Sequence, residues 1–196
     1  ERGGKIRLIT ITCSHFCEKV RFALGLMGLE YEESAHVPGG HTGDVVAAME
    51  GIDDDPMTMV PVIVYGGKVI QDSVDILKFL NDEAESASGW YPYPADHELK
   101  EEILAWEEMV GVVLGTSVRQ VMYYLLLQQP SLLFRTVLGY ESLSLPLWVL
   151  SQLVSPYLRW QLRAEPMSIN EESFEECMGY IRELFDDVEE WLGGGG

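Results

Sequence analysis

A short segment near the N-terminus, residues 13–17 (CSHFC), carries the side chains best suited to chemistry. A strand-like pattern precedes it and a helix-like pattern follows, so backbone N–H groups and the positive end of a helix surround it. Such a place stabilises an anion, and a thiolate is an anion. The Ser14 hydroxyl can donate a hydrogen bond to a bound thiolate, and a cysteine there would itself ionise easily. Ser14 is also a favoured helix cap, so both interpretations stay open at this point.

Two further positions could bind a short peptide. Val60-Pro61 begins a predicted strand, where a cis proline can expose the backbone N–H and C=O of Val60 to an extended peptide. Asp72-Ser73 begins a predicted helix, where Asp72 can bind an ammonium group while Ser73 binds a carboxylate. Together with a thiolate at Ser14, these positions fit glutathione.

The remaining cysteines and histidines do not form a second reactive site. Cys13 and Cys17 are separated by three residues, which is not the C-x-x-C spacing of a redox pair. We expect Cys13 to end a buried strand and Cys177 to lie on the apolar face of the last helix. The odd number of cysteines favours a reducing compartment, the cytoplasm or an organelle stroma. The histidines show no metal-ligand spacing, so we predict no metal site.

The elements that position these residues follow from periodicity. A strand at 5–11 leads into a helix that ends at Gly28, with Gly66-Gly67 as a later hairpin turn. We predict further strands at 30–33, 60–65 and 68–70, and helices at 45–49 and 74–80. The resulting order, β-α-β-(α)-β-β-α, is typical of an α/β thioredoxin-like domain over 1–85.

The pattern becomes purely helical after a linker at 86–95. Asp96 can cap a long helix reaching about Gln128, and Asn170 can cap an amphipathic helix that ends near Leu192. These features predict an all-helical domain over 96–196. Arginines, glutamines and prolines interrupt the apolar stretch 110–158, so we predict no membrane span. The chain carries 32 Asp and Glu against 13 Lys and Arg, a net charge of −19, which excludes nucleic-acid binding.

The signature of this N-terminal half resembles that of soluble glutathione transferases. The resemblance rests on residues 14–24 (SHFCEKVRFAL), 28–33 (GLEYEE), 60–64 (VPVIV), 67–70 (GKVI) and 72–77 (DSVDIL). It implies the glutathione transferase architecture, a thioredoxin-like domain followed by an all-helical domain. In that family a further hydrophobic helix follows the counterpart of 170–192. The sequence ends at Gly196, and we therefore expect an incomplete C-terminus.

The resemblance also implies roles for individual residues. Ser14 matches the position of the activating serine, which is a cysteine in thiol-transferring members, and Cys17 matches the second cysteine of the related glutaredoxin motif. Val60 would pair with the glutathione backbone and Pro61 would be the cis proline. Asp72 and Ser73 would bind the γ-glutamyl group, although Asp72 is shorter than the family's commoner glutamate. For the glycyl carboxylate, His36 and His41 are candidates.

Three functions are compatible with these residues. The first is a glutathione transferase that joins the glutathione thiolate, held by Ser14, to a small hydrophobic electrophile lodged against Trp106, Met109 and Val110. The alternative is a non-catalytic scaffold or accessory subunit. It would form a homodimer or dock, through an apolar region containing Tyr124 and Trp148, into a larger membrane-associated or photosynthetic assembly. The third is a thiol reductase using Cys17, which is disfavoured because Ser14 stands where the attacking cysteine is needed.

Overall fold

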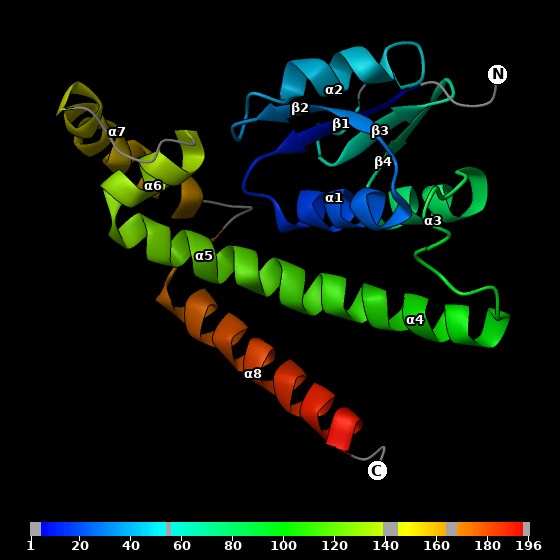
Figure 1. The fold of residues 1–196 in the computed structure, drawn as a ribbon. Coiled ribbons are helices and arrows are strands. Elements are labelled where there is room, and N and C mark those ends of the chain that lie inside the picture. The colour runs from blue at the N-terminus through cyan, green and yellow to red at the C-terminus, as the bar shows by residue number, and fades with distance from the viewer. Residues whose placement is uncertain (1–4, 54–55, 139–144, 164–167, 194–196) are drawn as a thin grey trace. The chain divides into compact units, whose positions relative to one another are not determined.

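The computed structural model describes residues 5–53, 56–138, 145–163 and 168–193 (Figure 1). The chain divides into two compact units, Glu1–Ile103 and Leu104–Gly196. We describe each unit by itself. The expected incompleteness of the chain after residue 193 lies outside the described residues.

The first unit is built on a mixed sheet of β1 (Ile6–Ile11), β2 (Tyr31–His36), β3 (Val62–Tyr65) and β4 (Lys68–Gln71). The strand order is β2-β1-β3-β4, with β1 and β2 parallel and the other two pairs antiparallel. The parallel pair needs a crossover helix, and the antiparallel hairpin turns at Gly66-Gly67, where both residues have positive φ. The predicted thioredoxin-like topology is confirmed.

Helices cover both faces of this sheet (Figure 1). They are α1 (His15–Met27), α2 (Thr42–Met49) and α3 (Ser73–Glu83), with α1 and α3 on one face and α2 on the other. Helix α1 buries one side, including Val20, Leu24 and Met27, and ends at Gly28, whose φ of 68° suits the left-handed cap. On the opposite face, Val45 of α2 packs against Ile9 and Val62 of the sheet.

A polar network ties α1 to the two parallel strands. The Arg21 guanidinium contacts the Glu33 carboxylate at 2.6 Å, and Thr10 Oγ1, which is fully buried, donates to the same carboxylate oxygen at 2.5 Å. Arg21 also donates to Thr10 Oγ1 at 3.0 Å. Partial burial alone would raise the pKa of Glu33, but the hydrogen bonds from Arg21 and Thr10 lower it below its usual value. The network therefore holds β1 and β2 against the middle of α1.

The division between the units falls within α4 (His97–Val110). The sequence suggests limits of 1–85, 86–95 and 96–196 instead. The segment after α3 belongs to the first unit because it is hydrogen-bonded there. Ser86 Oγ donates to the Met27 carbonyl at 3.2 Å, and the N–H of Tyr93 donates to Asn81 Oδ1 at 3.0 Å.

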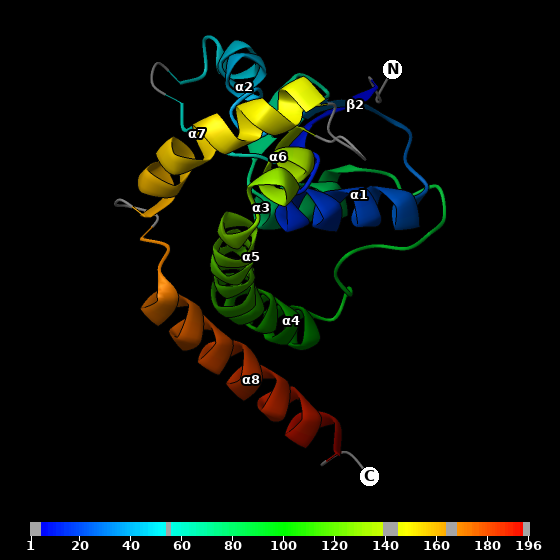
Figure 2. The ribbon, with the colours of Figure 1, turned by 90° about the vertical axis from the view of Figure 1, so that its left-hand side faces the viewer.

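The second unit is helical, as predicted. Helix α4 continues through a π-helical turn, η1 (Gly111–Gly115), into α5 (Thr116–Gln128), and α6 (Pro130–Leu138), α7 (Leu145–Arg163) and α8 (Glu171–Gly193) follow. Helix α8 runs alongside α5, and α6 lies beside α7 (Figure 2). A small core of Leu126, Leu127, Leu133 and Ile169 joins α5 and α6 to the segment just before α8.

The continuous helical run His97–Gln128 contains an 18-residue window with a mean hydropathy of 1.4, of which 22% is buried. Length and composition alone would allow such a helix to cross a membrane, and core helices of soluble proteins meet the same criterion. The absence of a membrane span stays a prediction.

Candidate functional site

The register of the sheet brings the predicted ligand positions to one edge. Strand β1 ends at Ile11, and β3 runs antiparallel to it with Val62 opposite Ile9. Val60-Pro61, just before β3, therefore lies beside the end of β1, where the chain turns towards Ser14.

The hairpin adds the third position to the same edge. Gln71, the last residue of β4, is paired with Val62, so the next residue along, Asp72, comes opposite Pro61. A hydrogen bond at 3.2 Å from the N–H of Asp72 to the Pro61 carbonyl fixes this arrangement. Three positions far apart in the sequence thus meet at the end of the sheet from which α1 and α3 begin.

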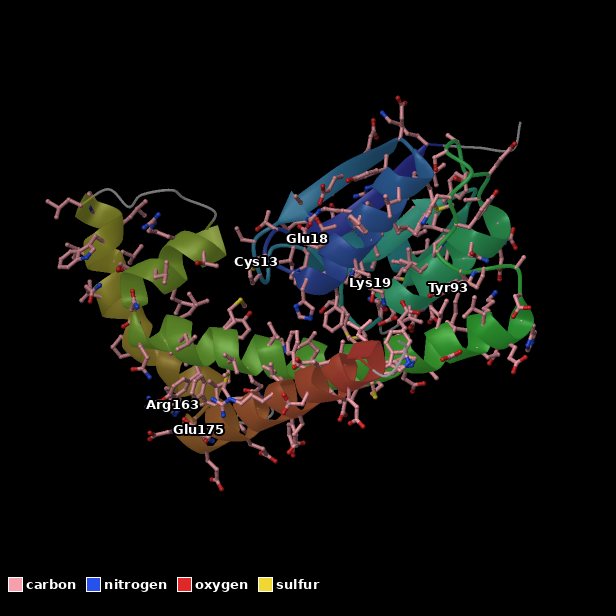
Figure 3. The ribbon with its side chains drawn as sticks, turned by 60° about the horizontal axis from the view of Figure 1, so that its bottom comes forward. Cys13, Glu18, Lys19, Tyr93, Arg163 and Glu175 are labelled. Atoms are coloured by element: carbon pink, nitrogen blue, oxygen red, sulfur yellow. The ribbon has the colours of Figure 1, made fainter. Side chains whose placement is uncertain are left out.

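Ser14 is the N-cap of α1. Its backbone is extended, and its Oγ accepts a hydrogen bond from the Cys17 N–H at 3.4 Å. Figure 3 labels Cys13 in the turn just before this cap and Glu18 in the first turn of the helix. A hydroxyl that accepts in this way still carries its own proton to donate. The capping and thiolate-binding interpretations of Ser14 are therefore compatible.

Cys17 lies on the inner face of α1 and is fully buried. Burial raises the pKa of its thiol, and the opposing effects of the Ser14 hydrogen bond and the Arg21 charge do not offset it. The expectation that a cysteine at this helix start ionises easily is wrong for Cys17, because the helix turns its side chain into the core. Cys13 lies half-buried in the turn after β1 rather than in the strand, and Cys177 is half-buried on α8.

The peptide bond between Val60 and Pro61 is cis, as the resemblance implies. The loop before it is held by side chains that sequence reasoning missed. Gln71 Nε2 donates to the carbonyls of Met57 and Met59, each at 2.7 Å. In the sequence, the one indication that Gln71 contributes to this site is its position next to Asp72.

Asp72 has an unusual backbone for a residue other than glycine, with φ 78° and ψ 138°. Such a conformation costs about 1–3 kcal/mol and is found mainly at ligand-binding and catalytic sites. The Asp72 side chain is exposed, and its Oδ1 accepts from the Val74 N–H at 2.8 Å at the start of α3. The next residue, Ser73, is buried. An exposed carboxylate and a helix N-terminus therefore stand together at this edge.

Each histidine suggested for the glycyl carboxylate has a partner within the first unit. His36 Nε2 is 3.0 Å from Asp44 Oδ2, and Arg7 Nη2 also contacts that oxygen at 3.0 Å. His41 is buried, with its Nε2 2.8 Å from the Thr58 carbonyl and its Nδ1 enclosed without a hydrogen-bond partner among the described residues. The residue that would bind this carboxylate stays a prediction.

The residues suggested for the electrophile and for docking lie in the helical region. Trp106, Met109 and Val110 belong to α4, and the Trp106 ring lies 5.7 Å from that of Trp191. Tyr124 stacks on Phe174 with ring centroids 4.6 Å apart, so it contributes to the protein's own core. Trp148, in contrast, is largely exposed. Over the described ranges, no three His, Cys, Asp or Glu side chains gather closely enough to hold a metal ion.

Comparison with known proteins identifies the domain that carries this edge. The model of the glutathione S-transferase N-terminal domain family matches residues 8–88, which include Ser14, Val60-Pro61 and Asp72-Ser73. Comparison with curated proteins gives no match.

Several solved structures share the fold of the whole chain. A glutathione S-transferase from Methylobacillus flagellatus KT with glutathione bound has a TM-score of 0.58 at 16% identity, covering 95% of this chain and 69% of that one. Poplar glutathione transferase F1 has a TM-score of 0.62 at 14% identity, covering 97% of this chain and 71% of that one. The beta-etherase LigF from Sphingobium sp. strain SYK-6 has a TM-score of 0.65 at 19% identity, covering 97% of this chain and 74% of that one. Residues 8–88 thus match the N-terminal domain family of the glutathione S-transferases, and the chain has the thioredoxin-like and helical architecture of a glutathione transferase.

Proposed function

We propose that this chain binds glutathione at the edge formed by Ser14, Val60-Pro61 and Asp72-Ser73, and joins its thiolate to a small hydrophobic electrophile. The observation that carries the proposal is the sheet register, which brings these three positions together within the range that the family model matches. Glutathione has one group for each position: a thiol, a peptide backbone and an amino-acid head.

Each position has a distinct role in this reaction. The proton of the Ser14 hydroxyl points to the glutathione sulfur, and the N-terminus of α1 adds a positive field, so the thiolate is favoured over the thiol. The backbone of Val60 pairs with the cysteinyl unit as an added strand. The Asp72 carboxylate binds the ammonium group, and Ser73 binds the carboxylate of the γ-glutamyl head. Glutathione binding then orients the sulfur for attack.

Titration calorimetry with glutathione tests the binding step. Asp72→Asn preserves size and the helix cap but removes the charge. We expect the Kd of this variant to rise about tenfold to a hundredfold, the usual effect of losing a charged hydrogen bond. Asp75→Asn is the matched control, because Asp75 is an exposed carboxylate in the first turn of the same helix. Equal effects of the two substitutions would contradict the assigned role of Asp72.

Conjugation to an activated chloronitrobenzene tests the transfer step. If the native chain neither binds glutathione nor conjugates common electrophiles, the enzyme proposal is abandoned in favour of the scaffold. The exposed Trp148 favours this alternative, whereas Tyr124, packed within its own unit, does not. A reductase using Cys17 is not proposed, because a buried thiol with a raised pKa is a poor attacking group.

A further inference from the structure

Among the side chains of α7 that the structure describes, most apolar ones are exposed, while two serines are buried. Leu153 and Trp160 are 72% and 68% exposed, while Ser151 is 0% exposed. The exposed stripe follows helical spacing along the whole element: Leu145, Val149, Leu153, Tyr157 and Trp160. A helix on a water-facing surface has the opposite pattern, with polar side chains outward.

The buried side of α7 carries two serines. Ser151 Oγ donates to the Trp148 carbonyl at 2.6 Å, one turn earlier in the same helix, and Ser155 is buried on the same side. Helix α6 lies beside α7 (Figure 2). The apolar stripe is therefore the outer face of a packed helix, and its surface has to be covered by something apolar.

The charge of this region differs from that of the rest of the chain. The sequence of α7 contains two arginines, Arg159 and Arg163, and no acidic residue, although the chain as a whole carries a net charge of −19. Between residues 109 and 163 the sequence has four arginines and a single acidic residue, Glu141. Arg163, labelled in Figure 3 at the end of α7, is exposed. The covering surface should therefore be both apolar and negatively charged.

We propose that α7 lies flat on an anionic lipid bilayer, with Leu145, Leu153 and Trp160 among the upper parts of the acyl chains. Interfacial helices have this composition, with leucine and tryptophan inserted, tyrosine at the headgroup level and arginines beside phosphates. The acidic residues nearest to α7 in the sequence, Glu141 and Glu165, lie beyond its two ends, and acidic charges more than about 10 Å from the lipid are largely screened at physiological salt.

A second copy of the chain is a poorer occupant of the stripe. In a two-fold contact between two α7 helices, each helix would bring its exposed Arg163 to the shared interface, with no acidic residue of α7 to pair with it. A bilayer containing anionic lipids offers both the apolar layer and the phosphates. The membrane proposal does not depend on glutathione binding, so an experiment can contradict either proposal without contradicting the other.

Vesicle flotation of the full chain tests the proposal. We expect the native chain to float with vesicles of phosphatidylcholine and phosphatidylglycerol, to float less with phosphatidylcholine alone, and to be released by high salt. The double variant Leu153→Ser/Trp160→Ser should bind about a hundredfold more weakly, about tenfold for each apolar side chain removed from the lipid. Phe185→Ser is the matched control, because Phe185 is 61% exposed on the acidic helix α8, and it should bind like the native chain.

Further measurements decide between the other occupants. Arg163→Gln should reduce the preference for anionic vesicles, and circular dichroism confirms that each variant is folded. No flotation of the native chain, or equal loss in Phe185→Ser, would overturn the proposal. A dimer detected by light scattering that the double variant dissociates, without vesicle binding, would assign α7 to a second copy instead. Retention on vesicles at high salt would indicate an inserted helix such as His97–Gln128 and would equally overturn it.

Discussion

The substitution Ser14→Ala separates the capping role that the structure shows for the Ser14 oxygen from the thiolate-binding role that we propose for it. As a cap, Ser14 Oγ accepts from the Cys17 N–H at 3.4 Å, which is long for a hydrogen bond. We therefore expect the loss of the cap to lower the free energy of unfolding by about 0.5–1 kcal/mol, the low end for such caps. Urea denaturation measures this effect in the absence of glutathione.

The loss of activation should be larger and should depend on pH. A hydroxyl that donates to a thiolate contributes about 1.5–3 kcal/mol, which corresponds to about 1–2 pKa units of the bound glutathione thiol. At neutral pH, kcat/KM for conjugation should therefore fall about tenfold to a hundredfold in Ser14→Ala. The activity should recover as the pH rises, because the thiol then ionises without the hydroxyl.

The pH dependence of kcat/KM is the decisive assay, with Ser14→Thr as the control that keeps both the hydroxyl and the cap. A variant whose kcat/KM falls by the same factor at every pH has lost positioning of the glutathione sulfur rather than activation of its thiol. If Ser14→Ala keeps the native pH profile and loses only unfolding free energy, Ser14 is a cap and the proposed mechanism is wrong.

Two further predictions concern the residues around this cap. Glu33→Gln should lower the free energy of unfolding at neutral pH by about 1–3 kcal/mol, because Arg21 and Thr10 lose a charged partner. The pKa of Glu33 in the folded protein is lowered, so its contribution to the free energy of unfolding is present above the unfolded pKa of 4.5 and is lost as the pH falls through the folded pKa. If the difference in urea stability between the native chain and Glu33→Gln does not narrow in acid, this assignment is contradicted. A thiol reagent should label Cys17 last, after the half-buried Cys13 and Cys177, and only as the chain unfolds. If Cys17 is labelled first, the reductase hypothesis is favoured again.

Local signals made much of the first unit predictable. The helix expected to end at Gly28 ends there, because glycine adopts the left-handed conformation at little cost. Gly66-Gly67 forms the expected hairpin turn for the same reason. Ser14 before α1 and Asp72 before α3 both cap through their side chains, as those residue types favour.

Features set by packing between distant segments were not predictable. The helix expected to run from residue 96 to about Gln128 contains the π turn η1, where Thr116 Oγ1 donates to the Val112 carbonyl. The Gln71 side chain binds two carbonyls of a loop twelve or more residues earlier, which no local pattern indicates. The sequence of α7 likewise does not show that its serines are buried and its leucines exposed, because packing against other helices decides which side of the helix faces inward.

The chemistry available at the start of α1 depends on the position of each residue within the first helical turn. Ser14 is the cap, so its side chain lies at the open end of the helix, where N–H groups and the edge of the sheet converge. Cys17 is three residues further on, and the rotation of the helix carries it to the inner face. The sulfur is thereby removed from the ligand edge while the hydroxyl stays there. The glutathione site that we propose would therefore hold a thiolate from outside through the Ser14 hydroxyl, rather than form a disulfide with Cys17.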